Sequence, residues 1–324
     1  MTLREFSTTK IKISPIAVGC WSFGNDSWWG HQDDKKSLAV LARAFELGIN
    51  LIDTAPVYGR GHSEEVVGKF LKQSGLREKA VVATKLGLNW DTKGPKIFHD
   101  LKPQRMLDEI DISRKRLDID SIDLYQVHWP DPEVPIAQVA ELMHSFYNKG
   151  LIKAVGVSNY SVEQMEEFIR YCPLHSLQPQ YSMFCRAIEG ATVDFCVKNN
   201  IAILAYAPLF AGLLTGKFFL DNKPVPNDIN RRMKKDHLCE PLFSVNKEFL
   251  AQLQKIAQKY KKSLTQLVLN WTINRTGITA VLAGARDCAQ LEDNAGAADW
   301  AILPEDLKTI DNLLACRDTA IGKK

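Results

Sequence analysis

Asp53, Lys85 and His128 each close an apolar run of the sequence, and Tyr58 follows Asp53 by five positions. These four residue types together suit proton transfer to a carbonyl oxygen. A tyrosine hydroxyl has a pKa of about 10, so it gives up its proton poorly at neutral pH. A lysine ammonium beside it would stabilise the phenolate and lower that pKa, and an aspartate would keep the lysine charged and oriented. A neighbouring histidine would hydrogen-bond the carbonyl oxygen, while hydride would come from a cofactor.

A single polar residue at the end of an apolar run is more often structural than catalytic, so the elements that hold these four matter. Apolar runs alternate with amphipathic helical segments along the chain, as expected for parallel strands covered by helices. The expected strands span residues 16–20, 50–53, 80–85, 122–128, 154–158, 177–181, 201–206 and 280–284. The expected helices span residues 33–47, 63–71, 103–117, 136–148, 161–171, 188–198, 247–259, 263–274 and 288–296.

This alternation fits either an open doubly wound sheet or a closed (β/α)8 TIM barrel. An open sheet that binds a dinucleotide would need a GxGxxG turn after its first strand, and the chain contains none. We therefore expect a TIM barrel, with residues 1–324 forming one domain. Residues 4–13 are expected to form a β-hairpin cap at the barrel floor, and residues 304–315 an extra C-terminal helix. In a barrel, the four polar residues would meet at the mouth.

The overall charge and the cysteine pattern exclude several other classes of protein. The formal net charge of the 324 residues is only +3, which argues against a nucleic-acid partner. No apolar stretch is long enough for a membrane span. The seven cysteines form no CxxC pair, which indicates reduced thiols in the cytoplasm and no metal site.

Several longer segments resemble the signatures of the aldo-keto reductase superfamily. They are residues 50–59 (NLIDTAPVYG), 82–85 (VATK), 123–130 (DLYQVHWP) and 156–160 (GVSNY). The resemblance covers nearly the whole chain. It implies that Tyr58 is the proton donor, that Lys85 and Asp53 tune it, and that His128 orients the substrate.

The same resemblance implies an NADP(H) cofactor. It assigns Ser158, Asn159 and Gln180, the last expected within its strand, to the nicotinamide carboxamide. Tyr206 would stack on the nicotinamide ring. The full set of implied cofactor residues is Trp21, Asp53, Ser158, Asn159, Gln180, Tyr206, Pro208, Leu209, Gly212, Lys217, Gly284, Arg286, Gln290, Asp293 and Asn294. Lys217 lies in the expected pyrophosphate loop, and Arg286 could grip a 2′-phosphate, which favours NADPH over NADH.

The expected substrate is a small aldehyde, ketone or sugar, reduced to its alcohol, or the corresponding alcohol in the reverse direction. Trp21, Tyr58, His128 and Trp129 are the expected substrate contacts. Residues 209–245 could form a lid, from which either Arg231 or Arg232 would reach the cofactor.

Two other functions fit the same sequence. One is a Schiff-base lyase or aldolase in which Lys85 is the nucleophile. The other is a regulatory protein that senses NADP(H), as some relatives in the superfamily do. The oligomeric state does not follow from the sequence.

Overall fold

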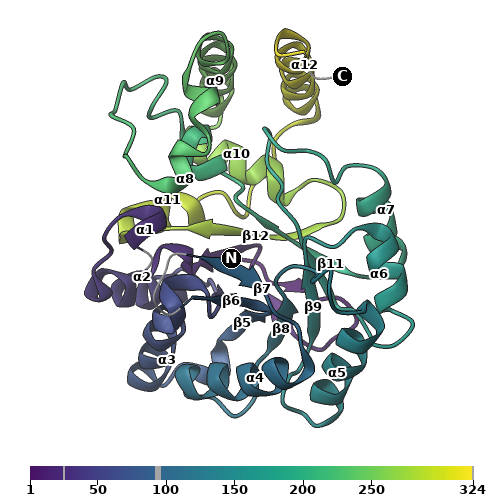
Figure 1. Cartoon of the computed structure of the whole chain (residues 1–324). Helices are drawn as coiled ribbons and strands as arrows, with labels where there is room; N and C mark the ends of the chain where they lie inside the picture. Colours follow the sequence, from purple (N-terminus) through teal and green to yellow (C-terminus); the bar gives the residue numbers. More distant parts are fainter. Residues whose placement is uncertain (25, 92–95, 323–324) are drawn as a thin grey trace.

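Eight parallel strands close into a barrel at the centre of the molecule (Figure 1). The computed structural model describes residues 1–24, 26–91 and 96–322. Around the barrel the strands follow the order β10, β11, β12, β3, β4, β5, β8, β9. Their bounds are β3 (Ile16–Gly19), β4 (Leu51–Asp53), β5 (Val81–Leu86), β8 (Leu124–Val127), β9 (Val155–Ser158), β10 (Ser176–Gln178), β11 (Ala202–Tyr206) and β12 (Ile278–Gly284). The predicted TIM barrel is confirmed.

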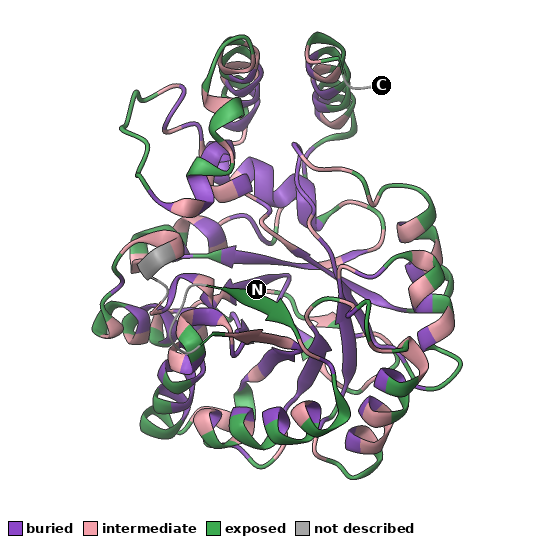
Figure 2. Ribbon diagram, viewed as in Figure 1, coloured by how far each residue is buried: buried purple, intermediate pink, exposed green. Residues whose placement is uncertain are grey.

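Helices lie around this barrel, and most of them turn a buried face toward it (Figure 2). They are α2 (Asp34–Glu46), α3 (His62–Ser74), α4 (Pro103–Leu117), α5 (Ile136–Asn148), α6 (Val162–Phe168), α7 (Ala191–Lys198), α9 (Leu242–Lys259), α10 (Leu264–Ile273) and α11 (Cys288–Ala295). Helix α4 has the predicted bounds, because Pro103 suits its first turn. Helix α10 begins after Ser263, which forms a capping box with Gln266. No helix among the described residues is long and apolar enough to cross a membrane.

The predicted cap and the predicted C-terminal helix are both present. Strands β1 (Arg4–Glu5) and β2 (Lys12–Ile13) pair antiparallel, and Phe6 and Ile13 bury their side chains among the residues of the barrel interior. Helix α12 (Pro304–Ala320) extends beyond the predicted end and packs against α9 (Figure 1). A second hairpin, formed by β6 (Leu88–Trp90) and β7 (Ile97–His99), follows β5 and was not expected.

The interior of the barrel changes from apolar to polar between its floor and its mouth. Near the floor it contains small and aliphatic side chains such as Ala17, Ala83 and Leu204. Toward the mouth, the strands place Asp53 and Lys85 inside it, and both side chains are buried. Burial of such charged groups is costly without partners, so the contacts of this polar layer show what holds the site together.

Candidate active site

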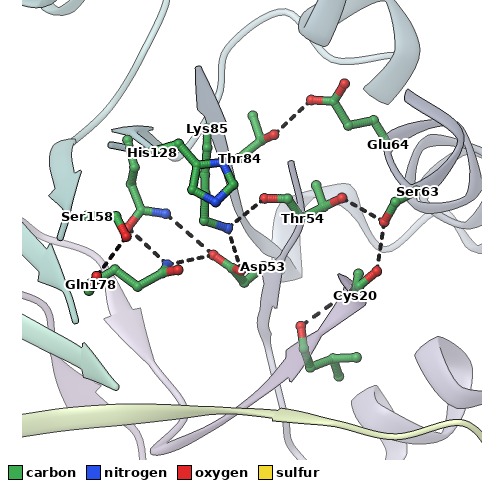
Figure 3. Close-up of polar contacts among 12 residues, drawn as sticks. Cys20, Asp53, Thr54, Ser63, Glu64, Thr84, Lys85, His128, Ser158 and Gln178 are labelled. Atoms are coloured by element: carbon green, nitrogen blue, oxygen red, sulfur yellow. Dashed lines mark hydrogen bonds and ion pairs between the residues drawn. The ribbon is translucent and has the colours of Figure 1, made fainter. Parts of the chain in front are cut away.

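Lys85 and Asp53 form a buried ion pair at the mouth of the barrel (Figure 3). Lys85 Nζ lies 2.6 Å from Asp53 Oδ1, and it also donates to the carbonyl oxygen of Thr54 at 2.9 Å. Lys85 is 0% exposed and Asp53 is 3% exposed. The ammonium is therefore held by two acceptors and does not move freely in the pocket.

Tyr58 packs beside this ion pair. Its ring centroid is 5.0 Å from Lys85 Nζ, 5.9 Å from the His128 ring centroid and 6.0 Å from that of Trp21, which stacks on it. Tyr58 opens the short turn η2 (Tyr58–Gly61), in which Gly59 has a φ of 59°. A Cβ on Gly59 would lie 2.6 Å from the carbonyl oxygen of Gly24, so only glycine fits this turn.

The first turn of α3 supports the strand ends that carry the site. Ser63 lies inside α3, one residue after its first residue His62, and its hydroxyl donates to the carbonyl oxygen of Cys20 at 3.0 Å. The same hydroxyl is 2.8 Å from Thr54 Oγ1. Glu64 accepts a hydrogen bond of 2.7 Å from Thr84, the neighbour of Lys85 (Figure 3). These contacts tie β3, β4 and β5 to one helix.

Burial acts on the two titratable side chains that face the ion pair. Burial, followed by the negative charge of Asp53, raises the pKa of Tyr58 well above its ordinary value. The tuning of Tyr58 by Lys85 stays a prediction. Burial, followed by the charge of Lys85, lowers the pKa of His128 well below its ordinary value. At neutral pH the pocket thus presents a neutral phenol and a neutral imidazole.

Three of the predicted nicotinamide contacts form one hydrogen-bonded group. The Tyr206 hydroxyl donates to Asn159 Oδ1 at 3.0 Å. Asn159 Nδ2 is 2.8 Å from Ser158 Oγ and 3.2 Å from the carbonyl oxygen of His128. Asn159 has a φ of 62°, in the left-handed region that asparagine tolerates better than most residues. The group joins β9 and β11 at the mouth, next to His128.

Gln180 is not within its strand, contrary to expectation. Strand β10 ends at Gln178. Gln180 lies beyond it and forms an isolated parallel β-bridge with Tyr206. Gln178 is the buried glutamine of this strand, and its Nε2 donates to Asp53 Oδ2 at 2.9 Å (Figure 3). Sequence reasoning missed Gln178 and also Gln126 on β8. The sequence feature that could have identified both glutamines is a polar residue at an inward-facing position of an otherwise apolar strand.

Two cationic side chains, Lys217 and Arg231, lie beside the loop that follows β11. Pro208 and Leu209 open this loop, and a Cβ on Gly212 would lie 3.7 Å from Lys217 Nζ and 3.8 Å from Arg231 Nη2. Burial, followed by the charges of Arg231, Lys223 and Arg286, lowers the pKa of Lys217. The loop therefore lies against cations that an anion would stabilise.

The structure distinguishes between the two candidate arginines of the 209–245 segment. Arg231, in α8 (Ile229–Arg232), is 7% exposed and lies over the Trp29 ring at 5.4 Å, whereas Arg232 is exposed. Arg231 pairs with Asp228, but its buried Nε has no hydrogen-bond partner among the described residues. An unsatisfied buried donor beside Lys217 fits a phosphate group, so the cationic cluster of Lys217 and Arg231 suits an anionic ligand.

Arg286 lies at the start of the turn after β12, but most of its donors are already in use. Its guanidinium donates to the carbonyl oxygens of Trp29 and His31, and its Nε is 3.0 Å from Gln32 Oε1. Gln32 Nε2 donates back to the Arg286 carbonyl oxygen at 3.1 Å. In this structure Arg286 holds the loop before α2. A 2′-phosphate would have to displace some of these acceptors.

The remaining predicted adenosine contacts lie on α11 or at its start. Asn294 Nδ2 donates to the Gly284 carbonyl oxygen at 3.2 Å and so joins α11 to the end of β12. Asp293 accepts from Ser263 at 2.6 Å, and Gln290 donates to Asp287 at 2.8 Å. The side chains of Asp293 and Gln290 thus have partners within the protein, and their contact with adenosine stays a prediction.

A cluster of tryptophans lies next to Tyr58. Trp21 is 5.6 Å from Trp28 and 5.3 Å from Trp29, measured between ring centroids. Trp129, which follows His128, is 40% exposed. Trp21 therefore packs between Tyr58 and the two other tryptophans, and the contacts of Trp21 and Trp129 with substrate stay a prediction.

These features define a (β/α)8-barrel protein with a phenol, an imidazole and a buried Lys–Asp pair at its mouth, together with the cationic cluster of Lys217 and Arg231 beside the loop after β11. The chain belongs to the aldo/keto reductase family, whose model matches residues 15–315. It is thus an oxidoreductase of carbonyl groups, in a family that uses nicotinamide cofactors.

Individual relatives are similar over nearly their whole length. The chain is 40% identical to the aldo-keto reductase YhdN of Bacillus subtilis (strain 168), covering 97% of this chain and 94% of the relative. It is 32% identical to the NADH-specific methylglyoxal reductase of Escherichia coli (strain K12), covering 90% and 91%. The solved structure of the glycerol dehydrogenase AKR11B4 from Gluconobacter oxydans superimposes with a TM-score of 0.89 at 37% identity, covering 97% and 95%.

Proposed function

We propose that this protein is an NADP(H)-dependent reductase of small aldehydes and ketones, including sugars, in which Tyr58 donates the proton. The observation that carries the proposal is the placement of the Tyr58 ring within contact of both His128 and the Lys85–Asp53 pair. The cationic cluster of Lys217 and Arg231 supports the choice of a dinucleotide cofactor.

The chain's own residues would carry out the proton transfer. Bound NADPH would supply the hydride. Neutral His128 would donate a hydrogen bond to the carbonyl oxygen and hold it near Tyr58. Tyr58 would then protonate that oxygen as negative charge develops on it. The Lys85 ammonium would stabilise the remaining phenolate, while Asp53 keeps Lys85 in place.

The cofactor would extend from the mouth, past the cationic cluster, to α11. Ser158, Asn159 and Gln180 would bind the carboxamide, and Tyr206 would stack on the nicotinamide. Lys217 and Arg231 would bind the pyrophosphate, which Pro208, Leu209 and Gly212 would approach through their backbone. At the adenosine end, the proposed contacts are Gly284, Arg286, Gln290, Asp293 and Asn294.

The test is turnover with a panel of aldehydes, ketones and sugars, followed by the absorbance of the reduced cofactor with NADPH and with NADH. We expect saturable, carbonyl-dependent oxidation of NADPH. Tight NADPH binding with no turnover of any carbonyl would contradict a reductase and favour a sensing role. Covalent trapping of a substrate on Lys85 by borohydride would instead favour a Schiff-base lyase. The two hydrogen bonds and full burial of Lys85 argue against that role.

The Arg286→Ala variant is expected to weaken NADPH binding about 10- to 100-fold, because a 2′-phosphate would lose a charge-assisted contact. NADH binding should weaken much less. Gln32→Leu is the matched control, since it breaks the contact between Arg286 and the loop but keeps the guanidinium charge. Calorimetric titration with both cofactors measures the ratio of affinities. An equal loss for NADPH and NADH in Arg286→Ala would show that Arg286 only holds the loop.

The kcat/KM for carbonyl reduction is expected to stay constant from about pH 6.5 to about pH 10. Burial lowers the pKa of His128, so it gains a proton only below this range, and burial raises the pKa of Tyr58, so it loses its proton only above it. In alcohol oxidation Tyr58 must first lose its proton, so that rate should rise with pH. Profiles in both directions measure this. An acid limb near pH 6.5 would show that His128 titrates normally.

We also propose a cytoplasmic location. All seven cysteines are free. Free thiols are typical of proteins kept in a reducing compartment.

A further inference from the structure

Two buried glutamines bind the oxygen of Asp53 that Lys85 leaves free. Gln178 Nε2 lies 2.9 Å from Asp53 Oδ2 and 3.2 Å from Gln126 Oε1. Gln126 Nε2 lies 3.4 Å from the same carboxylate oxygen. The two oxygens of Asp53 thus have different partners, with an ammonium at Oδ1 and amides at Oδ2 (Figure 3 shows Gln178, Asp53 and Lys85).

The barrel leaves room for the Gln126 side chain. Gly156 on β9 faces it, and a Cβ on Gly156 would lie 2.8 Å from Gln126 Cγ and would also collide with Ser176 Oγ. Any larger residue at position 156 would push Gln126 away from Asp53. The glutamine, which is 0% exposed, therefore occupies a space that the neighbouring strand provides.

An amide is well suited to this position. A hydrocarbon side chain would remove one donor from Asp53 Oδ2, and burial makes such a loss costly. A second cation would compete with Lys85 for the carboxylate. Gln126 stabilises the charged carboxylate without adding charge, and it also accepts from Gln178. With donors on both oxygens, the Asp53 carboxylate has one orientation, which aims Oδ1 at Lys85.

We propose that Gln126 is a positioning residue for proton transfer: it orients Asp53, and through it Lys85, beside Tyr58 without touching substrate or cofactor. This inference rests on the proposed reductase function. Gln126 lies on β8 two residues before His128, with its side chain inside the barrel beneath the reacting groups.

The test compares Gln126→Met, which keeps the length but cannot donate, with Gln126→Glu. We expect Gln126→Met to lower kcat about tenfold at every pH while the KM for the carbonyl stays within about twofold, because one hydrogen bond to a charged group is lost. The charged groups that face position 126 are Asp53 from β4 and Lys85 from β5. In Gln126→Glu, the introduced carboxyl is expected to donate to Asp53 while it is protonated. It should repel Asp53 once ionised, so kcat should fall as pH rises.

A second readout needs neither cofactor nor turnover. Infrared difference spectra of the cofactor-free Gln126→Glu protein should show a protonated carboxyl that persists to near-neutral pH and is missing from the wild type. Ser176→Ala is the matched control, because Ser176 is equally buried in the same layer and its hydroxyl has no hydrogen-bond partner among the described residues. It should retain wild-type kinetics.

The outcomes separate the inference from the proposed function. Gln126→Met with kcat within twofold of wild type, or Gln126→Glu with a flat pH profile and no protonated carboxyl near neutrality, would overturn the positioning role. If Gln126→Met does not fold, the contact with Asp53 can still be tested in Gln126→Glu at pH values where the introduced carboxyl is protonated. A wild-type protein that turns over no carbonyl would defeat the proposed function alone, since the infrared titration would still report on Gln126 and Asp53.

Discussion

Tyr58→Phe is expected to lower kcat for carbonyl reduction about 10³-fold, which is within the usual contribution of a general acid. The substitution removes only the hydroxyl, so the ring that stacks on Trp21 and meets His128 edge-on should stay in place. Among the described residues, Tyr58 is the acid that the proposed mechanism places at the carbonyl oxygen, so without its hydroxyl the alkoxide would have to take its proton from water. Steady-state oxidation of NADPH measures the effect.

The Tyr58→Phe substitution is expected to slow the chemical step and to leave the affinity for NADPH unchanged. Fluorescence titration with NADPH should give a dissociation constant within about twofold of wild type, because the phosphates would contact Lys217 and Arg231, away from the hydroxyl. If the variant keeps a tenth or more of the wild-type kcat, the proton comes from another group. The first candidate would then be His128.

Lys85→Met is expected to damage both activity and stability. It would leave the Asp53 carboxylate, which is 3% exposed, without its counter-ion. Breaking a buried pair in this way typically costs about 3–5 kcal/mol of the free energy of unfolding. The phenolate of Tyr58 would also lose the ammonium near it, so kcat should fall about 10²-fold or more. Urea denaturation and steady-state kinetics measure the two effects.

The double variant Asp53→Asn with Lys85→Met separates the two effects of Lys85→Met. Asparagine keeps the shape of Asp53 and can still accept from the Gln178 amide, but it is uncharged. Most of the lost stability should therefore return, because no buried charge is left unpaired. Activity should not return, since the ammonium is still missing. If single and double variants are equally unstable, the loss comes from packing at position 85.

The alternation of strands and helices was predictable because it depends on local properties of the chain. Apolar runs and cap residues such as Pro103 and Ser263 act within a few neighbouring positions. Strand ends were less certain. The prediction extended strand β10 to Tyr181, but pairing with its neighbours ends it at Gln178, and Gln180 lies beyond it.

The polar contacts between elements were not predictable in the same way. Ser63 looks like an N-cap by its position in the sequence, yet it bonds Cys20 and Thr54 across two strands. Arg231 and Arg232 are adjacent and chemically identical, and only the packing of α8 against α1 (Asp26–Trp29) buries the first and exposes the second. Which polar contacts form, and which of two adjacent side chains is buried, depends on the direction of each side chain in the closed barrel.

By itself, the sequence determined the barrel, the family resemblance and the residue types at the mouth, since strand periodicity and motif order are properties of the chain. Only the tertiary structure decided the electrostatics. Burial of the Tyr58 phenol and the charge of Asp53, which lies 2.6 Å from the Lys85 ammonium, raise the pKa of Tyr58, and neither follows from the sequence. The amides around Asp53 likewise come from β8 and β10, far apart in sequence. The environment of a charge depends on every strand around it, and therefore on closure of the barrel.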